Sequence, residues 1–272
     1  MDELISVVVS TYNWPEALNL ALKSLSLQTD SNFEIVVADD GSGPETARVV
    51  DEWRRKSSVR IIHSWQEDKG FRLARSRNAA VTRCSGGYLV FMDGDCIVRR
   101  DFVASHRRLA ERRSVLAGQR ILVAKHFSQV CLNSGDLTWC ESLSKLRDLG
   151  RIRAVNRWQP AVSLPLGFLR TIRPNRWQLL RGCNWSLYRE DFLAVGGQDE
   201  AFEGWGYEDS DMAIRLICSG CSIKWAGFTS PCFHLWHKNA DRTISPENLS
   251  RLETVRRMKK VLPTKPMQEC YD

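Results

Sequence analysis

The sequence has no apolar run that approaches the roughly 20 residues needed to cross a membrane. Its first residues, Met1-Asp-Glu-Leu4, lack the basic, then apolar, then small-residue order of a signal peptide. Internal repeats and low-complexity tracts are also absent. We therefore expect a folded cytoplasmic protein, whose 272 residues can bury a sizeable core.

Cysteine pairing has little support either. The nine cysteines are odd in number, scattered and mostly in apolar surroundings, as reduced core thiols are. Cys218 and Cys221 form the one CxxC, and a structural zinc site there would need Cys232, His234 or His237 to fold back onto it. We expect two core cysteines at a helix end rather than zinc, and no disulfide framework.

The whole chain is basic, with 39 Lys and Arg against 32 Asp and Glu. Acidic residues are especially scarce in one of its segments. Between Lys145 and Arg181 there are nine basic residues and one acid, Asp148. This segment predicts either an anionic partner (phosphates, acidic lipid or nucleic acid) or a solvated loop. Prolines indicate a loop over residues 151–176, and the sequence leaves open whether that loop is a mobile lid.

Strand and helix signals alternate through the first half of the chain. Strands are expected at residues 4–10, 33–38, 59–62 and 88–92, with helices at 15–25, 44–56 and 73–83. This alternation predicts an α/β fold with a mostly parallel sheet covered by helices. In the less regular second half, helices are expected at residues 101–113 and 208–218, mixed helical signals over 128–149, and strands within 115–123 and 184–188.

The C-terminal segment, residues 246–262, predicts a basic amphipathic helix. Its apolar side comprises Leu249, Leu252, Val255, Met258 and Leu262. Such a helix either packs on the protein or lies on an anionic membrane. Packing is the favoured interpretation.

Two acidic pairs follow predicted strands. Asp39 and Asp40 end one strand, and Asp93-Gly-Asp95 ends another. Ligands of open parallel sheets bind outside the carboxyl ends of the strands, so both pairs are expected at one crevice. An Asp-Gly-Asp turn offers oxygen ligands that suit Mg²⁺ or Mn²⁺ against a diphosphate, although such triplets also serve as plain turns.

Gly41-Ser-Gly43, between a predicted strand and a predicted helix, allows a second interpretation. A nicotinamide-dependent oxidoreductase would place a pyrophosphate on that helix N-terminus. Thr46 occupies the third glycine position, however, and two carboxylates precede the glycines where the pyrophosphate would approach. A carboxylate there suits a base or a ribose hydroxyl better, and Asp40 could also simply cap the helix.

Gly204-Trp-Gly206 precedes acids that head the helix predicted from Glu208. The adaptable glycines and the flat indole suit the stacking of a sugar, and a neighbouring carboxylate could accept a hydroxyl proton. Acids in a first helical turn are also common simply because they complement the helix dipole. Further along, His234 or His237 could complete an oxygen-rich metal site.

Taken together, these segments resemble the inverting GT-A glycosyltransferases of glycosyltransferase family 2. The C-terminal part is similar to the galactosyltransferase-type region of chondroitin-polymerase-like and β-1,4-galactosyltransferase-like enzymes. The matching segments occur in the family's order: residues 7–13, 37–42, 70–78, 91–95 and 204–211, and His234.

The resemblance implies roles for individual residues. Nucleotide or donor contacts are implied for Thr11, Tyr12, Asp40, Arg77, Asn78 and Asp93, with Asp39 the less expected alternative to Asp40 for reading uracil. Asp93 would contact the donor sugar or ribose, directly or through water. Metal ligation is implied for Asp95 and His234, with Asp93 as a further candidate and His237 as the alternative histidine.

Catalytic and acceptor roles follow in the same way. Asp209 resembles the catalytic base and Glu208 its acceptor-binding partner, although Ser210 stands where related enzymes often have a third acid. Trp205, and with less support Trp185 and Trp236, would offer faces to the sugars.

The implied activity is metal-dependent, inverting transfer from a UDP-sugar to a hydroxyl of a glycan or lipid-linked acceptor, in cell-surface polysaccharide or lipopolysaccharide synthesis. Mn²⁺ or Mg²⁺ is the expected cofactor. The protein could also contact the inner face of an anionic membrane peripherally, and nucleic acid is not an expected partner. Residues 1–123 would form the nucleotide-sugar half, 124–240 the acceptor-binding and catalytic half, and 241–272 the basic tail. The alternatives are the oxidoreductase and a non-enzymatic carbohydrate- or nucleic-acid-binding module.

Overall fold

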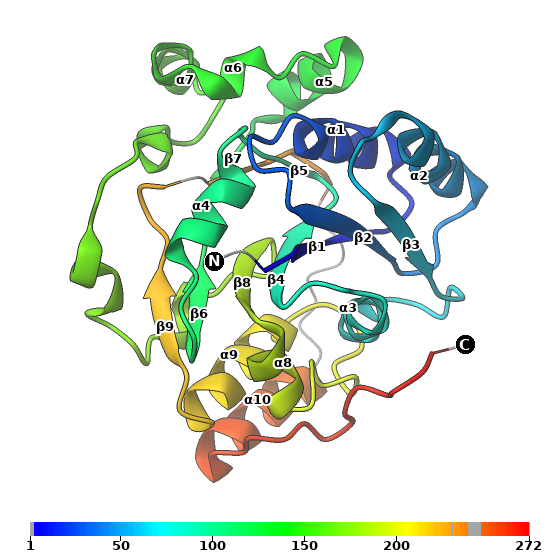
Figure 1. The fold of residues 1–272 in the computed structure, drawn as a ribbon, viewed down its shortest axis with the longest axis vertical. Helices are drawn as coiled ribbons and strands as arrows, with labels where there is room; N and C mark the ends of the chain where they lie inside the picture. Colours follow the sequence, from blue (N-terminus) through cyan, green and yellow to red (C-terminus); the bar gives the residue numbers. More distant parts are fainter. Residues whose placement is uncertain (1–2, 230, 239–245, 272) are drawn as a thin grey trace.

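The fold is seen in a computed structural model that describes residues 3–229, 231–238 and 246–271 (Figure 1). A seven-stranded sheet in the order β3-β2-β1-β4-β8-β6-β9 forms its centre. The strands are β1 (Ile5–Thr11), β2 (Phe33–Asp39), β3 (Ile61–Trp65), β4 (Tyr88–Asp93), β6 (Ser114–Ala117), β8 (Asn184–Tyr188) and β9 (Ser222–Trp225). Only β8 runs antiparallel to its neighbours, so the predicted mostly parallel sheet is confirmed.

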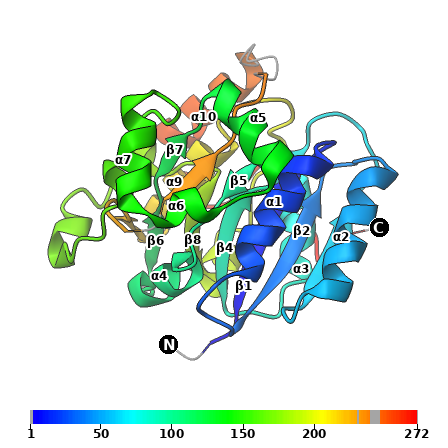
Figure 2. The same cartoon turned by 90° about the horizontal axis from the view of Figure 1, so that it is seen from above.

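Helices cover both faces of this sheet, as the alternating sequence predicts. They are α1 (Pro15–Ser26), α2 (Pro44–Lys56), α3 (Leu73–Thr82), α4 (Phe102–Leu109), α5 (Lys125–Ser134), α6 (Thr138–Glu141), α7 (Leu143–Arg151), α8 (Arg189–Ala194), α9 (Glu208–Cys218) and α10 (Pro246–Met258). Successive side chains of a strand point to opposite faces. Val7 and Val9 of β1 therefore pack with α1, α2 and α4, whereas Val8 packs with α3, α8 and α9 (Figures 1 and 2).

A second, three-stranded sheet lies beside the main one, and the sequence does not predict it. Its order is β5-β10-β7, formed by β5 (Cys96–Ile97), β10 (Cys232–His234) and β7 (Arg120–Leu122). Phe233 of β10 packs in a separate apolar cluster with α5 and α6, which form a further layer at the top of Figure 1. This small sheet joins the segment after β4 to the segment that carries the histidines.

The basic segment is more ordered than a plain loop. Short 3₁₀ turns form at Gln159–Ala161, Gly167–Thr171 and Trp177–Leu179. The buried Arg170 side chain donates to the carbonyls of Leu164, Trp225 and Gly227. The segment is thus tied to the end of β9.

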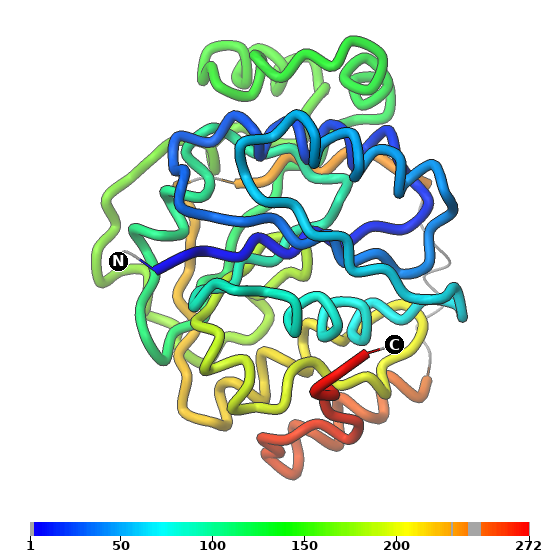
Figure 3. The backbone as a smooth tube through the Cα atoms, turned by 45° about the vertical axis from the view of Figure 1, so that its right-hand side comes forward, coloured from blue at the N-terminus to red at the C-terminus, as the bar shows by residue number. Residues whose placement is uncertain are grey.

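The C-terminal helix α10 packs on the protein, which the sequence favours. Leu252 and Val255 are buried against Ile214 of α9, whereas Leu249 and Met258 on the same predicted side are exposed. The chain after α10 then runs along the loop at residues 196–200, where Lys265 and Met267 make backbone hydrogen bonds (Figure 3). None of the described helices combines the length and apolar character of a membrane span.

Candidate active site

The two acidic pairs meet at the carboxyl edge of the sheet, as expected. Asp39 lies beside Thr11 and Asp93 beside Ser10 in the parallel registers of β1. The Asp-Gly-Asp turn approaches β1 closely: Gly94 N donates to Ser10 O at 2.6 Å, and a Cβ on Gly94 would lie 2.9 Å from that oxygen. Glycine is required here for that reason, and the turn is fixed against the strand.

Asp39 and Asp40 differ sharply in their surroundings. The Asp39 carboxylate is fully buried, 2.8 Å from His63 Nε2, and accepts a hydrogen bond from Ser42 N. It holds the turn after β2. The Asp40 carboxylate accepts from Gln66 Nε2 and, at 2.7 Å, from Arg72 N. Burial raises the pKa of Asp40 to about 6, against these lowering hydrogen bonds.

The raised pKa predicts a pH-dependent stability effect of Asp40. Because its folded pKa lies above the ordinary 3.8, folding loses stability as pH rises from about 4 to 6, by up to about 3 kcal/mol. The Asp40→Asn variant cannot ionise there. Its free energy of unfolding at pH 8 is therefore expected to exceed that of the wild type by about 1–3 kcal/mol. The difference should disappear near pH 4.

Urea denaturation at both pH values measures this effect. Asp51→Asn, at an exposed position on α2, is the matched control and should show no such pH-dependent difference. An equal stability change for Asp40→Asn at pH 4 and pH 8 would contradict the assigned cause.

Tyr12 lies at the same edge of the sheet and contacts Asp68, a contact that the sequence does not predict. Its hydroxyl donates to Asp68 Oδ2 at 3.0 Å, and its ring is half exposed. Gly41, with φ +100°, has Asp68 Cα where a Cβ would stand, 2.5 Å away. The loop at residues 66–72 therefore forms one wall beside Tyr12 and Asp40.

A candidate metal centre lies beyond the Asp-Gly-Asp turn. Asp95, His234 and His237 each present a ligand atom, and these atoms lie within 4.8 Å of one another. His234 Nε2 is 3.5 Å and His237 Nε2 3.4 Å from the Asp95 carboxylate. Burial raises the pKa of Asp95, and the two histidines oppose that shift.

The histidine orientation fits metal binding. His234 Nδ1 lies 3.1 Å from Leu235 O, and His237 Nδ1 lies 3.0 Å from Lys238 O. A proton on each Nδ1 would leave both Nε2 lone pairs directed toward Asp95, the arrangement that metal-bound histidines use. Oxygen and imidazole ligands together suit Mn²⁺. The two histidines, weighed as alternatives from the sequence, lie together.

The small sheet brings these ligands together from distant parts of the chain. In the β5–β10 pair His234 lies opposite Cys96, the neighbour of Asp95. Leu235 N donates to Asp95 O at 2.9 Å, and Val123 N to His234 O at the same distance. The backbone of three segments therefore fixes the spacing of the candidate ligands.

Arg77 links the acidic turn to helix α9. Its buried guanidinium donates to Ser10 Oγ, to Asp93 Oδ1 and to Gly182 O, at 2.8 to 2.9 Å. Its Nη1 is buried with no hydrogen-bond partner among the described residues. Burial raises the pKa of Asp93 to about 7, although the Arg77 charge opposes it.

The acids at the start of α9 lie at the other end of this link. Gly182 N donates to Asp209 Oδ2 at 3.1 Å, and Ser210 Oγ donates to Asp209 Oδ1. Desolvation and the neighbouring Asp209 charge raise the pKa of Glu208 to about 7, while Arg77 lowers it. A carboxyl group with such a pKa changes charge near neutral pH.

The expected sugar-stacking tryptophans separate into two groups. Trp205 and Trp236 are each about two-fifths exposed, and Asn248 of α10 supports the Trp205 loop by donating to Glu203 O. Trp185 is fully buried and stacks on Phe91 with ring centroids 4.2 Å apart. The prediction that Trp185 binds the acceptor is therefore wrong: it is a core residue between two sheet strands.

Asn78 is also engaged inside the protein. Its amide donates to Gln198 O and Glu200 Oε1 and accepts from Gln198 N. These bonds fasten α3 to the loop before α9. A contact of Asn78 with the donor stays a prediction.

Residues 6–145, just over half of the chain, match the model of glycosyl transferase family 2. The chain belongs to this family. A second model, described as the N-terminal domain of galactosyltransferase, matches residues 169–238 of the family 2 chain. The resemblance drawn from the motifs is thus confirmed for both parts.

Named relatives agree with this membership. Validoxylamine A glucosyltransferase of Streptomyces hygroscopicus subsp. jinggangensis is 30% identical over 236 residues, which cover 80% of the family 2 chain and 52% of the relative. Chondroitin synthase of Pasteurella multocida is 26% identical over 233 residues, covering 81% and 23%. The family 2 chain thus spans about half the length of the first of these relatives and a quarter of the other.

The fold has solved counterparts as well. The structure of GalNAc-T7 with UDP, GalNAc and Mn²⁺ is similar, with a TM-score of 0.64 and 17% sequence identity. The match covers 98% of the present chain and 53% of the GalNAc-T7 chain. At this identity the likeness concerns the fold alone. It confirms the predicted GT-A architecture.

Proposed function

We propose that this protein is a metal-dependent, inverting glycosyltransferase that uses a UDP-sugar. One observation carries the proposal: Arg77 and Gly182 connect Asp93, on the turn that leads to the candidate metal ligands, with Asp209 at the start of α9. The carboxylates that we assign to the donor side and to the acceptor side are thus joined by one short hydrogen-bonded link. That is what direct transfer between two bound sugars requires.

The chain's own residues account for the other parts of the reaction. Asp95, His234 and His237 would hold Mn²⁺ or Mg²⁺, which when bound neutralises charge on the diphosphate leaving group. Asp209 accepts the proton of the acceptor hydroxyl as that oxygen attacks the anomeric carbon. Glu208 orients the acceptor, and the unpartnered Nη1 of Arg77 offers a buried hydrogen bond to the donor.

We also propose that Asp40 and Tyr12 receive the nucleotide base. Asp40 ends the strand beside β1, and its carboxylate keeps acceptor sites beyond those used by Gln66 and Arg72. A uracil ring has an N–H that can donate a hydrogen bond to such a carboxylate. The similar GalNAc-T7 structure contains UDP and Mn²⁺, which supports this choice of nucleotide and of metal.

The proposed acceptor is a glycan or a lipid-linked glycan of the cell surface. Chondroitin synthase, by its name a polysaccharide-forming relative, supports a glycan. Exposed Ile152, Phe168 and Ile172 stand in the basic segment and favour contact with an anionic membrane. Sedimentation with anionic vesicles tests that contact.

Calorimetry of nucleotide binding tests the proposal. UDP is expected to bind in the presence of Mn²⁺ and to bind much more weakly after chelation, whereas NAD should not bind under either condition. GDP serves as the matched control for the base. Binding of NAD without metal, or indifference to UDP in both conditions, would contradict the proposal.

A further inference from the structure

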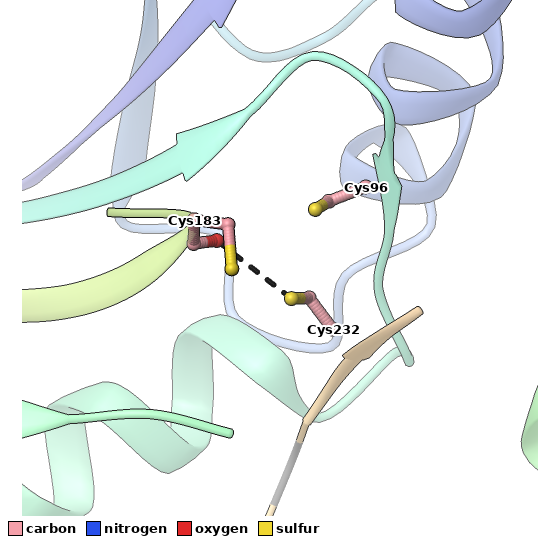
Figure 4. A group of neighbouring side chains, drawn as sticks. All are labelled: Cys96, Cys183 and Cys232. Atoms are coloured by element: carbon pink, nitrogen blue, oxygen red, sulfur yellow. Dashed lines mark hydrogen bonds between the residues drawn. The ribbon is translucent and has the colours of Figure 1, made fainter. Parts of the chain in front are cut away.

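Three cysteines form a buried cluster outside the candidate active site (Figure 4). Cys96 belongs to β5, Cys232 to β10, and Cys183 immediately precedes β8. Their exposed fractions are 0%, 0% and 2%, and their sulfur atoms lie within 4.8 Å of one another. The CxxC pair, Cys218 and Cys221, is not part of the cluster.

We propose that these three thiols bind one soft, thiophilic d¹⁰ metal ion. Thiolate ligands select such ions over hard ones. Three sulfurs at about 2.3 Å from a central ion lie about 4 Å apart, so a contraction of less than about 1 Å closes the site. Figure 4 shows the three sulfur atoms gathered in one space between the segments that carry them.

The surroundings suit an anionic metal–thiolate group. Three thiolates around a divalent ion carry one net negative charge. Arg120 lies beside Cys232 in the parallel register of β7 and β10, so both side chains are on the same face. The Arg120 guanidinium also interacts electrostatically with Cys183, Cys232 and Cys96, so its positive charge is placed to compensate the thiolates.

The partly exposed Asp95 side chain adjoins the cluster and gives an ion the shortest approach to it. Cys96 Sγ lies 3.7 Å from Asp95 Oδ1, and the Asp95 side chain is 15% exposed. Each thiol releases its proton to solvent as its sulfur binds the ion. Cys232 Sγ donates to Cys183 O at 3.7 Å, a long hydrogen bond that is easily exchanged for a metal bond.

Cadmium titration of the reduced, chelator-treated full chain tests the site. Thiolate-to-cadmium charge transfer should increase the ultraviolet absorption up to one ion per chain, with release of protons. Cys183→Ser is expected to abolish this absorption, and Cys96→Ala repeats the test if the serine variant fails to fold. Cys218→Ser and Cys270→Ser are matched controls that should retain it.

The readout separates this site from the oxygen–imidazole centre. Asp95→Ala should keep the cadmium absorption, because its sulfur ligands remain, and Mn²⁺ should not produce the band. Absence of the band in the wild type, its persistence in folded Cys183→Ser, or its loss in Cys218→Ser would each overturn the proposal. Failure of UDP binding would leave this result unaffected.

Discussion

Asp95→Ala is expected to lower the rate of sugar transfer by about 10³-fold, since a lost metal ligand removes several kcal/mol of charge stabilisation at the leaving group and about 4 kcal/mol corresponds to that factor. Asp95 stands between both histidines, 3.4 and 3.5 Å from their Nε2 atoms. Its removal leaves two imidazoles and no carboxylate. Mn²⁺ affinity should fall together with the rate.

Steady-state transfer assays at several Mn²⁺ concentrations measure this effect, with Asp51→Ala on the exposed side of α2 as the control. His237→Ala, measured beside His234→Ala, shows whether both histidines bind the ion. An Asp95→Ala variant that folds and transfers sugar at the wild-type rate would remove the metal centre from the mechanism.

The second large effect is expected for Asp209→Asn. If Asp209 takes the acceptor proton, an amide in its place should lower kcat by about 10²–10⁴-fold with little change in KM. Asparagine keeps the shape of the side chain and an oxygen that accepts from Gly182 N, so the link to Arg77 survives. The loss would then reflect chemistry rather than folding.

Glu208→Gln is the matched comparison, because Glu208 is the adjacent acid in the same helical turn. We expect it to raise the acceptor KM more than it lowers kcat. A larger kcat loss in Glu208→Gln than in Asp209→Asn would exchange the two roles.

Local patterns were sufficient to predict the first half of the fold. Helical spacing and β-branched runs placed the elements from β1 to β4 to within a few residues, and parallel pairing then placed Asp39, Asp40, Asp93 and Asp95 at one edge. The pattern could not rank Asp39 against Asp40. Their difference arises from His63, Ser42, Gln66 and Arg72, which arrive from other segments.

The second half depends on contacts between distant segments, and sequence patterns predicted it less well. The family resemblance implied a sugar-facing role for Trp185, yet β8 lies inside the sheet between β4 and β6, and the Trp185 side chain is fully buried. The strands of the small sheet have two or three residues each, too few to show a period. For the same reason, the sequence did not predict that the two histidines lie together or that three cysteines form a cluster.

The pairing of β5 with β10 also bears on how the protein matures. Chains emerge from the ribosome N-terminal end first, at about 5–20 residues per second, and long-range pairings form late because loop closure costs entropy. Strands β1 to β4 can assemble while β10 is still being synthesised. The proposed metal site therefore forms only after β10 has been made, so chains truncated before β10 should form the β1–β4 part of the sheet yet lack that site.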